Sequence, residues 1–221
     1  MPLSDYLYLY FELICLFTAI FFYIKKRNKL PLYFIPFLFL TVTVEFLGRW
    51  GAFPKGFGKY SMYNIFTALE FFFYALLFYA HFKKMFFKRL AFFFIPCFFF
   101  AVGLNFIFIQ GLNKTFHSYT FLIGSFFIIV FCCCFFYESV LPERIDEQLS
   151  KQPFFWICSG LLIFYLGSVI INALFEYLIS NDLQLEGKKI YNIINRSLNV
   201  LLYSSFCIAF YLCRDNRKTY S

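Results

Sequence analysis

The fold is decided by residues 188–213, KKIYNIINRSLNVLLYSSFCIAFYLC. This stretch is long and apolar enough to cross a bilayer, yet one stripe at helical spacing is polar. A guanidinium near the middle of a membrane helix costs about 2.5 to 3.5 kcal/mol, so it must face protein or trapped water rather than lipid. The stretch therefore predicts a bundle in which other membrane helices cover the polar stripe. The stripe consists of Asn192, Asn195, Arg196 and Asn199.

The whole chain has the composition of a polytopic membrane protein. Its 221 residues are 62% hydrophobic, which is more apolar surface than a soluble domain of this length can bury. The 39 phenylalanines are expected mainly at lipid-facing positions, where any large apolar side chain serves. The net charge of +8 comes from short basic clusters at the ends of apolar runs, so it indicates membrane topology rather than nucleic-acid binding. The eight cysteines form no Cys-x-x-Cys pair and are expected to be small hydrophobic side chains.

Seven apolar runs predict an all-α membrane protein, a single domain of seven transmembrane helices over residues 1–221. The first run is expected to be a retained helix, because no positive charge precedes it and no cleavage-site pattern follows it. The fifth run carries no charge until Glu138 and is expected to be either the most lipid-exposed helix or a purely structural one. The seven runs cover residues 6–24, 31–48, 61–80, 90–110, 118–137, 153–179 and 188–213.

The distribution of lysine and arginine predicts the orientation of the helices. If the N-terminus is outside, the inner loops and the C-terminal tail hold about twice as many basic residues as the outer loops. The sequence therefore predicts an N-out, C-in topology.

With that orientation, the polar residues inside the helices all lie in the outer half of the membrane. This profile predicts a polar cavity that opens outward above a sealed inner floor. The acids in this set are Glu12, Glu45, Glu70 and Glu176, and they outnumber Arg49 and Arg196. Surplus buried carboxylates must be protonated, hydrated or bound to a cation or amine. The candidate ligand-binding residues are Glu12, Glu45, Asn64, Glu70, Asn172, Glu176, Asn192, Asn195, Arg196 and Asn199.

A structural role competes with ligand binding at each of these positions. Amides such as Asn64 commonly hydrogen-bond one membrane helix to another, each bond being worth about 0.6 to 2 kcal/mol. Arg196 lies at a depth similar to that of Glu176, and we expect the two to form a structural ion pair. The ligand contact is then expected at Glu45, Asn64 and Glu70.

A faint internal repeat surrounds these residues. Both copies span the end of an outward helix, an outer loop and the start of an inward helix. The repeat predicts two parallel three-helix units, residues 6–80 and 118–213, joined by a linker helix at 90–110. The first copy reads Glu45-Phe46-Leu47, Gly58-Lys59 and Tyr63-Asn64-Ile65, and the second reads Glu176-Tyr177-Leu178, Gly187-Lys188 and Tyr191-Asn192-Ile193.

Motifs of common catalytic or cofactor-binding sites are absent from the sequence. It has no His-Glu-x-x-His, no Gly-x-Ser-x-Gly and no phosphate-binding glycine loop. Its two histidines, His81 and His117, fall at opposite ends of their helices and are expected at the membrane interfaces. No catalytic residue, metal ligand or cofactor is predicted.

Four further motifs carry a family resemblance. They are Glu45-Phe46-Leu47, Tyr63-Asn64-Ile65-Phe66 with Leu69-Glu70-Phe71, Phe154-Phe155-Trp156-Ile157-x-x-Gly160, and Asn192-x-x-Asn195-x-x-x-Asn199. In these motifs the chain resembles a group of uncharacterised bacterial membrane proteins with seven helices, some of which resemble the membrane sensor region that precedes a histidine kinase. The resemblance implies the bacterial inner membrane and a sensory role. The chain departs from the kinase-linked form, because only a short tail follows its last apolar run.

The leading hypothesis is an inner-membrane protein that binds a small ligand from the outer side and acts as a sensor or as an accessory subunit. Residues 138–152, which carry mixed charge, and the C-terminal tail are the expected docking surface for a membrane or cytoplasmic protein. The alternative is a small-solute transporter of the parallel-repeat type, which needs a polar path through the inner half of the membrane. A third hypothesis is an intramembrane enzyme whose carboxylates relay protons.

The charge distribution makes the topology testable. A reporter that is active only in the cytoplasm should be active when fused after Ser221 and inactive when fused after Lys114, because these positions are predicted to lie on opposite sides of the membrane. The reverse pattern of reporter activity would contradict every depth assigned above.

Overall fold

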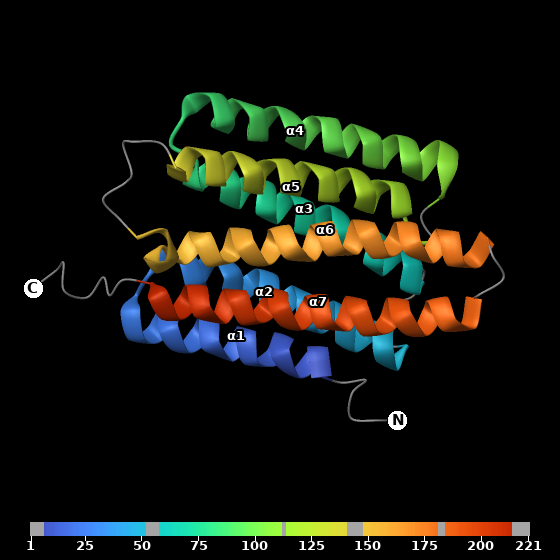
Figure 1. Cartoon of the computed structure of the whole chain (residues 1–221), viewed down its shortest axis with the longest axis horizontal. Helices are drawn as coiled ribbons and strands as arrows, with labels where there is room; N and C mark the ends of the chain where they lie inside the picture. The colour runs from blue at the N-terminus through green and yellow to red at the C-terminus, as the bar shows by residue number, and fades with distance from the viewer. Residues whose placement is uncertain (1–6, 52–57, 112–113, 141–147, 181–183, 214–221) are drawn as a thin grey trace, which may run out of the picture. The chain divides into compact units, whose positions relative to one another are not determined.

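The structure is a computed structural model that describes residues 7–51, 58–111, 114–140, 148–180 and 184–213, without the side chains of 175–180, 184–186 and 188. Over these residues the chain is helical and has no strand (Figure 1). Seven helices in this part of the chain are long and apolar enough to cross a membrane, which confirms the predicted fold class and indicates a multi-pass protein in contact with lipid. They are α1 (Leu7–Lys26), α2 (Lys29–Trp50), α3 (Lys59–His81), α4 (Met85–Leu104), α5 (Ser118–Val140), α6 (Pro153–Ser180) and α7 (Gln184–Leu212).

Contacts between helices divide the chain into two compact units, each of which is described by itself. Unit 1 comprises Met1–Leu38 and Ile145–Ser221, which include α1, the first part of α2, α6 and α7. Unit 2 comprises Phe39–Arg144, which include the rest of α2, α3, α4 and α5. The predicted repeats instead place α1 with α2 and α3, so the two units do not coincide with the repeats. The repeat itself stays a prediction.

In unit 1, α6 and α7 pack closely because glycines on α6 let the two backbones approach. A Cβ atom added to Gly160 would lie 2.7 Å from the Cβ of Ser205. A Cβ atom added to Gly167 would lie 2.6 Å from a methyl group of Leu198. Such close contacts stabilise helix pairs in lipid, where no hydrophobic effect drives helices together. The two contacts also fix the antiparallel register of α6 against α7.

The parallel pair α1 and α7 of unit 1 is held together where both helices end. The Lys26 ammonium donates hydrogen bonds to the backbone carbonyls of Tyr211 and Cys213, the latter at 2.8 Å. It also lies 4.9 Å from the centre of the Phe22 ring. Burial raises the pKa of the Cys213 thiol to about 11, an effect that the Lys26 charge only partly offsets, so the thiol is neutral at physiological pH. Lys26 therefore binds the carbonyl end of α7, where a helix favours positive charge.

The first part of α2 joins this pair through a short turn. Arg27 has a positive φ of 51°, and the Asn28 side chain accepts a hydrogen bond of 2.9 Å from the N–H of Leu30, which caps the start of α2. Two turns into the helix, the buried Phe34 ring meets the rings of Phe206 and Phe210 on α7 at 5.0 and 5.3 Å. Aromatic packing thus ties α2 to α7 in unit 1.

Unit 2 has a core of phenylalanine rings between α3, α4 and α5, which lie side by side in Figure 1. Phe71 of α3 lies 3.9 Å from Phe98 of α4 between ring centres, and Phe94 of α4 stacks on Phe127 of α5 at 4.3 Å. Towards the other end of these helices, Phe131 continues the same set of contacts. A Cβ atom at Gly124 of α5 would lie 3.1 Å from the Phe98 ring, so a larger residue there would displace this core.

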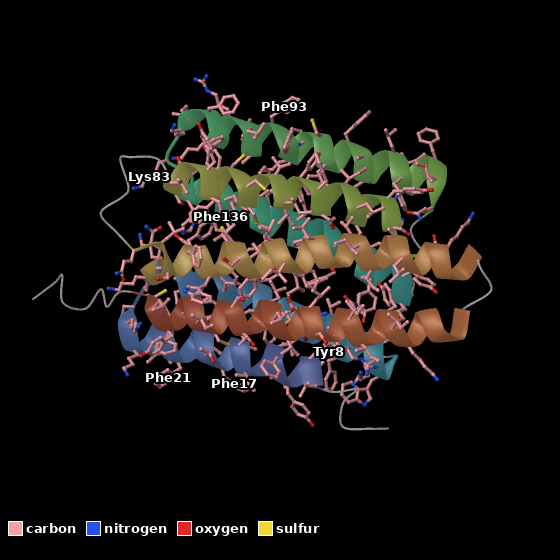
Figure 2. The ribbon with its side chains drawn as sticks, in the orientation of Figure 1. Tyr8, Phe17, Phe21, Lys83, Phe93 and Phe136 are labelled. Atoms are coloured by element: carbon pink, nitrogen blue, oxygen red, sulfur yellow. The ribbon has the colours of Figure 1, made fainter. Side chains whose placement is uncertain are left out.

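The expectation that phenylalanine mainly faces lipid is therefore only partly right. Phe17, Phe21 and Phe93 are exposed and point away from the helices in Figure 2, as lipid-facing residues should. Others are fully buried, because in a membrane protein the same apolar residue suits both lipid and core. For that reason the alternative that α5 is the most lipid-exposed helix is also wrong: 39% of its membrane window is buried, against 11% for α4. The fully buried phenylalanines are Phe34, Phe71, Phe78, Phe82, Phe98, Phe131, Phe206 and Phe210.

A buried carboxylate closes the predicted inner end of unit 2. Glu138 belongs to the last turn of α5 and is 3% exposed. Its carboxylate accepts hydrogen bonds from the backbone N–H groups of Lys83, at 2.9 Å, and Lys84, which precede α4. The N-terminus of α4 favours a negative charge at this place. Glu138 therefore caps a neighbouring helix and is itself not exposed to a partner, while the docking role of the rest of residues 138–152 stays a prediction.

The contact between Gly160 and Ser205 makes a stability prediction. Gly160→Ala should destabilise the protein by about 1 to 3 kcal/mol, because the Cβ of Ser205 is fixed to its backbone and cannot move aside. Ser205→Gly should restore much of this loss in the double mutant. Gly103→Ala in α4 is the matched control: its Cβ meets nothing within 4 Å, so stability should be unchanged or slightly higher. Thermal unfolding in detergent measures all four proteins, and equal stability of Gly160→Ala and Gly103→Ala would contradict the close packing.

Candidate functional site

A buried polar cluster lies at the predicted outer end of unit 2, where α3 begins and α4 gives way to α5. Its centre is the side-chain amide of Asn64, which is 3% exposed. The amide nitrogen donates to the carbonyl of Thr115 at 3.0 Å, and the amide oxygen accepts from the N–H of His117 at 2.9 Å. Asn64 thus provides hydrogen-bond partners for two backbone groups of the non-helical segment before α5. These distances support the structural role predicted for Asn64 as the alternative to ligand binding, namely hydrogen bonding between segments of the protein.

The second part of the cluster ties the end of α4 to the start of α5. Here α4 continues as a π-helical turn, Asn105–Ile109, a feature that is rare and often marks functional sites. The buried Asn105 amide donates to Gln110 Oε1 and to Thr120 Oγ1, both at 2.9 Å. The Asn105 side chain thus bridges the turn, and the irregular backbone lies where polar side chains can satisfy it.

His117 completes the cluster and is only 2% exposed. Its Nε2 lies 3.1 Å from the carbonyl oxygen of Gly111, which can only accept, so Nε2 carries the hydrogen. His117 directly precedes α5, at a helix end as expected, and its hydrogen bonds with Asn64 and Gly111 hold it within unit 2. Its position at a membrane interface stays a prediction. One signal in the sequence could have revealed its burial: Asn64, Asn105 and His117 all fall at the predicted outer ends of consecutive apolar runs.

Two buried polar atoms of this region, Ser61 Oγ and Asn105 Oδ1, lack a hydrogen-bond partner among the described residues. The second ring nitrogen of His117, Nδ1, makes no hydrogen bond to the described residues, while Nε2 is used by Gly111. Buried polar atoms in proteins are nearly always paired, with protein, water or a ligand. The cluster therefore has unused capacity to bind a polar group.

A cavity of about 450 Å³ lies against this cluster, between α3 and α4. Asn64 and His117 line one end, and the rest of the wall is apolar, including Leu69 and Phe99 at the far end. The floor includes Gly103, next to which a Cβ atom would meet nothing. The volume is within the range of small-molecule sites.

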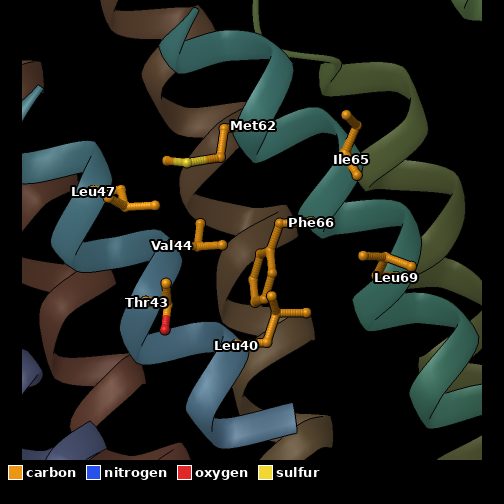
Figure 3. Close-up of a pocket in the computed structure, with 8 residues that line it drawn as sticks. All are labelled: Leu40, Thr43, Val44, Leu47, Met62, Ile65, Phe66 and Leu69. Atoms are coloured by element: carbon orange, nitrogen blue, oxygen red, sulfur yellow. The ribbon is translucent and has the colours of Figure 1, made fainter. Parts of the chain in front are cut away.

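A second groove, of about 250 Å³, lies on the other side of α3, between α3 and the part of α2 in unit 2. Figure 3 shows its lining, in which Val44 of α2 and Phe66 of α3 face one another across the groove. Ile65 and Leu69 line both spaces. The wall is apolar apart from the Thr43 side chain, whose hydroxyl donates to the carbonyl of Phe39. This groove therefore offers a ligand mainly apolar contacts.

Two of the predicted acids, Glu45 and Glu70, belong to unit 2 with Asn64. Glu45 is half-buried in α2, and one of its oxygens lies 3.5 Å from the hydroxyl of Tyr63. The Tyr63 ring packs over Gly48, where a Cβ atom would collide with it. Glu70 is half-buried in α3, on a helix with Asn64 but outside the lining of the α3–α4 cavity. The structure thus places Asn64 at the cavity and the two acids elsewhere in unit 2.

The remaining predicted residues belong to unit 1. Glu12 of α1 is 2% exposed and lies one turn before Cys15, which contacts Cys207, so it faces α7 rather than lipid. Asn172 and Asn199 donate their amide hydrogens to carbonyls of their own helices, at 2.7 and 2.9 Å. The side chain of Glu176 lies outside the described residues. The predicted site residues of α7 become more exposed towards the start of the helix. Asn195, Arg196 and Asn199 are half-buried, and Asn192 is exposed.

The register of α6 against α7 bears on the expected ion pair. Gly160 faces Ser205 and Gly167 faces Leu198, which places Arg196 opposite Val169. Glu176 is about two helical turns further along α6. The pair of Arg196 with Glu176 stays a prediction, and in this register it requires both side chains to extend along the helix axes.

The described residues contain no group of three or more His, Cys, Asp and Glu side chains that could hold a metal ion. Comparisons of the chain with protein-family models, with curated proteins and with solved structures find no match. The resemblance to sensor-linked seven-helix proteins therefore stays a prediction, and the site rests on its own geometry.

The internal repeat supplies a matched pair of variants for the polar cluster. Asn64→Ala should destabilise the protein by about 1 to 3 kcal/mol, because it leaves the carbonyl of Thr115 and the N–H of His117 without their partner. Asn192→Ala, at the position that the repeat equates with Asn64, should change stability by less than about 0.5 kcal/mol, because Asn192 is exposed. Thermal unfolding of both variants checks this, and similar losses would show that the cluster does not hold unit 2 together.

Proposed function

We propose that this chain is a bacterial inner-membrane protein, with its N-terminus outside, that binds a small ligand in the outer half of the membrane and acts as a sensor or as an accessory subunit of a membrane partner. The observation that carries the proposal is the α3–α4 cavity with the buried His117 and Asn64 at one end. A polar end and an apolar wall suit a ligand that has both kinds of surface.

Rigidity of the cluster supports a binding role. Asn64 and Asn105 fix the end of α4 and the start of α5 through four hydrogen bonds of 2.9 to 3.0 Å. The hydrogen bond of 3.1 Å between His117 Nε2 and the carbonyl of Gly111 then holds the imidazole in one orientation before a ligand arrives. Preorganisation of this kind lowers the entropic cost of binding.

The other end of unit 2 favours sensing over transport. Fully buried phenylalanines, including Phe78 and Phe131, fill the space between its helices there. The carboxylate of Glu138 closes the end by capping α4. A transporter needs a polar path that opens to each side in turn, whereas a sensor needs only an outer site and a helix that responds to it. In the described part of unit 2, the buried phenylalanines and Glu138 occupy the end away from the cavity, which supports the sensor hypothesis.

The partner surface is proposed on residues 138–152 and the C-terminal tail. Residues 141–147 and the tail lie outside the described residues, and Glu138 is buried. Gln148, Ser150 and Lys151, in and beside the short 3-10 turn Leu149–Lys151 that precedes α6, are exposed. Among the described residues of the predicted surface, these three are polar or charged and exposed, which supports a role in docking.

Native mass spectrometry of the protein purified in mild detergent from its own membranes tests the proposal. The protein should retain a small molecule, and Asn64→Ala, which loosens the cluster, should retain less of it. Proteoliposomes that contain the protein should then bind this molecule without accumulating it. Absence of any retained molecule would contradict the binding role, and accumulation would show a transporter instead.

A further inference from the structure

We propose that the α3–α4 cavity binds a single-chain carboxylic acid of the fatty-acid type, with its hydrocarbon chain along the groove and its carboxyl group at His117. This inference rests on the proposed function and names its ligand class. The cavity, the unpaired ring nitrogen of His117 and a neighbouring lysine carry it.

The groove has the shape and polarity of a site for one hydrocarbon chain. It runs along α4 from Phe106, near the cluster, to Phe99, which is about two helical turns or roughly 10 Å. Apart from Asn64 and His117, its wall is apolar. Ile65, Leu69, Phe99 and Phe106 on its rim are exposed, so a molecule dissolved in the bilayer can enter from the side. A chain in the groove would stay in apolar surroundings along its whole length.

The head group is indicated by His117. Its Nε2–H is used by the carbonyl of Gly111, while Nδ1 has no partner among the described residues although the side chain is 2% exposed. A carboxyl group complements this nitrogen in either protonation state: the neutral acid donates to neutral imidazole, and the carboxylate accepts from imidazolium. An alcohol can also hydrogen-bond both forms, because a hydroxyl group donates and accepts, but it carries no charge to attract an imidazolium. The charge-assisted hydrogen bond between carboxylate and imidazolium therefore favours an acid at this nitrogen.

A positive charge near the same end favours the acid further. Lys114 lies three positions before His117 in the segment between α4 and α5, and it is exposed. Its side chain packs beside Gly111, the residue that accepts the hydrogen bond from His117, with the Cδ atom 3.5 Å from the place of a Cβ there. A carboxylate at His117 would be attracted by this ammonium group.

The volume of the groove, about 450 Å³, favours a single-chain acid over a phospholipid. A phospholipid would place one of its two chains outside the groove and would bring a larger phosphate head to the polar end beside Asn64. A fatty acid needs neither. We therefore take the single-chain acid as the ligand and treat an anionic phospholipid as an outcome that would overturn the assignment.

Gly103 allows the groove to be filled without disturbing its neighbours. Its Cβ position meets no atom within 4 Å, so Gly103→Leu places a side chain in open space on the groove floor. Gly103→Ala is the matched control, because it makes the same change of backbone with a single carbon. His117→Gln is the head-group variant: the amide of Gln can still donate to Gly111, but it has no counterpart of Nδ1.

The experiment measures binding to the full chain in phosphatidylcholine nanodiscs, with hexadecanoic acid, hexadecanol, acetate and phosphatidylglycerol as probes. Hexadecanoic acid should bind about tenfold more tightly than hexadecanol, equivalent to about 1.4 kcal/mol or one hydrogen bond, and acetate should not bind. Gly103→Leu should lose binding of both long-chain probes, and Gly103→Ala, which adds a single carbon to the same wall, should weaken binding less. His117→Gln should bind both probes equally. Thermal unfolding without probe confirms that each variant is folded.

The outcomes separate this inference from the proposed function. Equal binding of acid and alcohol by the natural protein, or competition by phosphatidylglycerol at equal concentration, overturns the fatty-acid assignment. If hexadecanoic acid does not bind but another molecule is retained from native membranes and is lost in Gly103→Leu, the ligand class is wrong and the proposed function stands. If nothing is retained and no probe binds, both are wrong.

Discussion

The side-chain amide of Asn64 is the interaction on which the polar end of unit 2 depends. In a bilayer each backbone N–H and C=O needs a partner within the protein, and the segment between α4 and α5 is not helical. Asn64 supplies the partner for Thr115 and for His117 from a helix that precedes them by about fifty residues. Without it, the backbone N–H of the buried His117 and the carbonyl of Thr115 would lose these partners.

The two units solve the packing problem in lipid by different means. Unit 1 uses close backbone approach at Gly160 and a cationic contact at Lys26, which joins the ends of α1 and α7. Unit 2 uses phenylalanine rings between its helices and a polar contact at each end, with Asn64 at one and Glu138 at the other. In both units the polar contacts occur where helices end, because the backbone is unsatisfied there.

The sequence predicts the seven helices because hydropathy and length are local properties. It places α4 too late, at residue 90 instead of Met85, because the charged residues near its start resemble a loop. The N-terminus of α4 is stabilised by Glu138, which lies beyond the whole of α4 in the chain, and no local pattern reveals such a cap. The burial of His117 is missed for the same reason, since it depends on Asn64. Conversely, Asn64 and Asn192 look equivalent in the sequence, yet one is buried and the other exposed.

An experimental structure of the protein purified from its own membranes would test the α3–α4 site most directly. Electron cryomicroscopy in a lipid nanodisc should show density for an elongated molecule along α4 from Phe99 to Phe106, ending beside the ring of His117. It should also show the Asn64 amide in contact with the backbone at Thr115 and His117. A groove filled by side chains of the protein, or a His117 ring that faces the aqueous phase, would contradict the site.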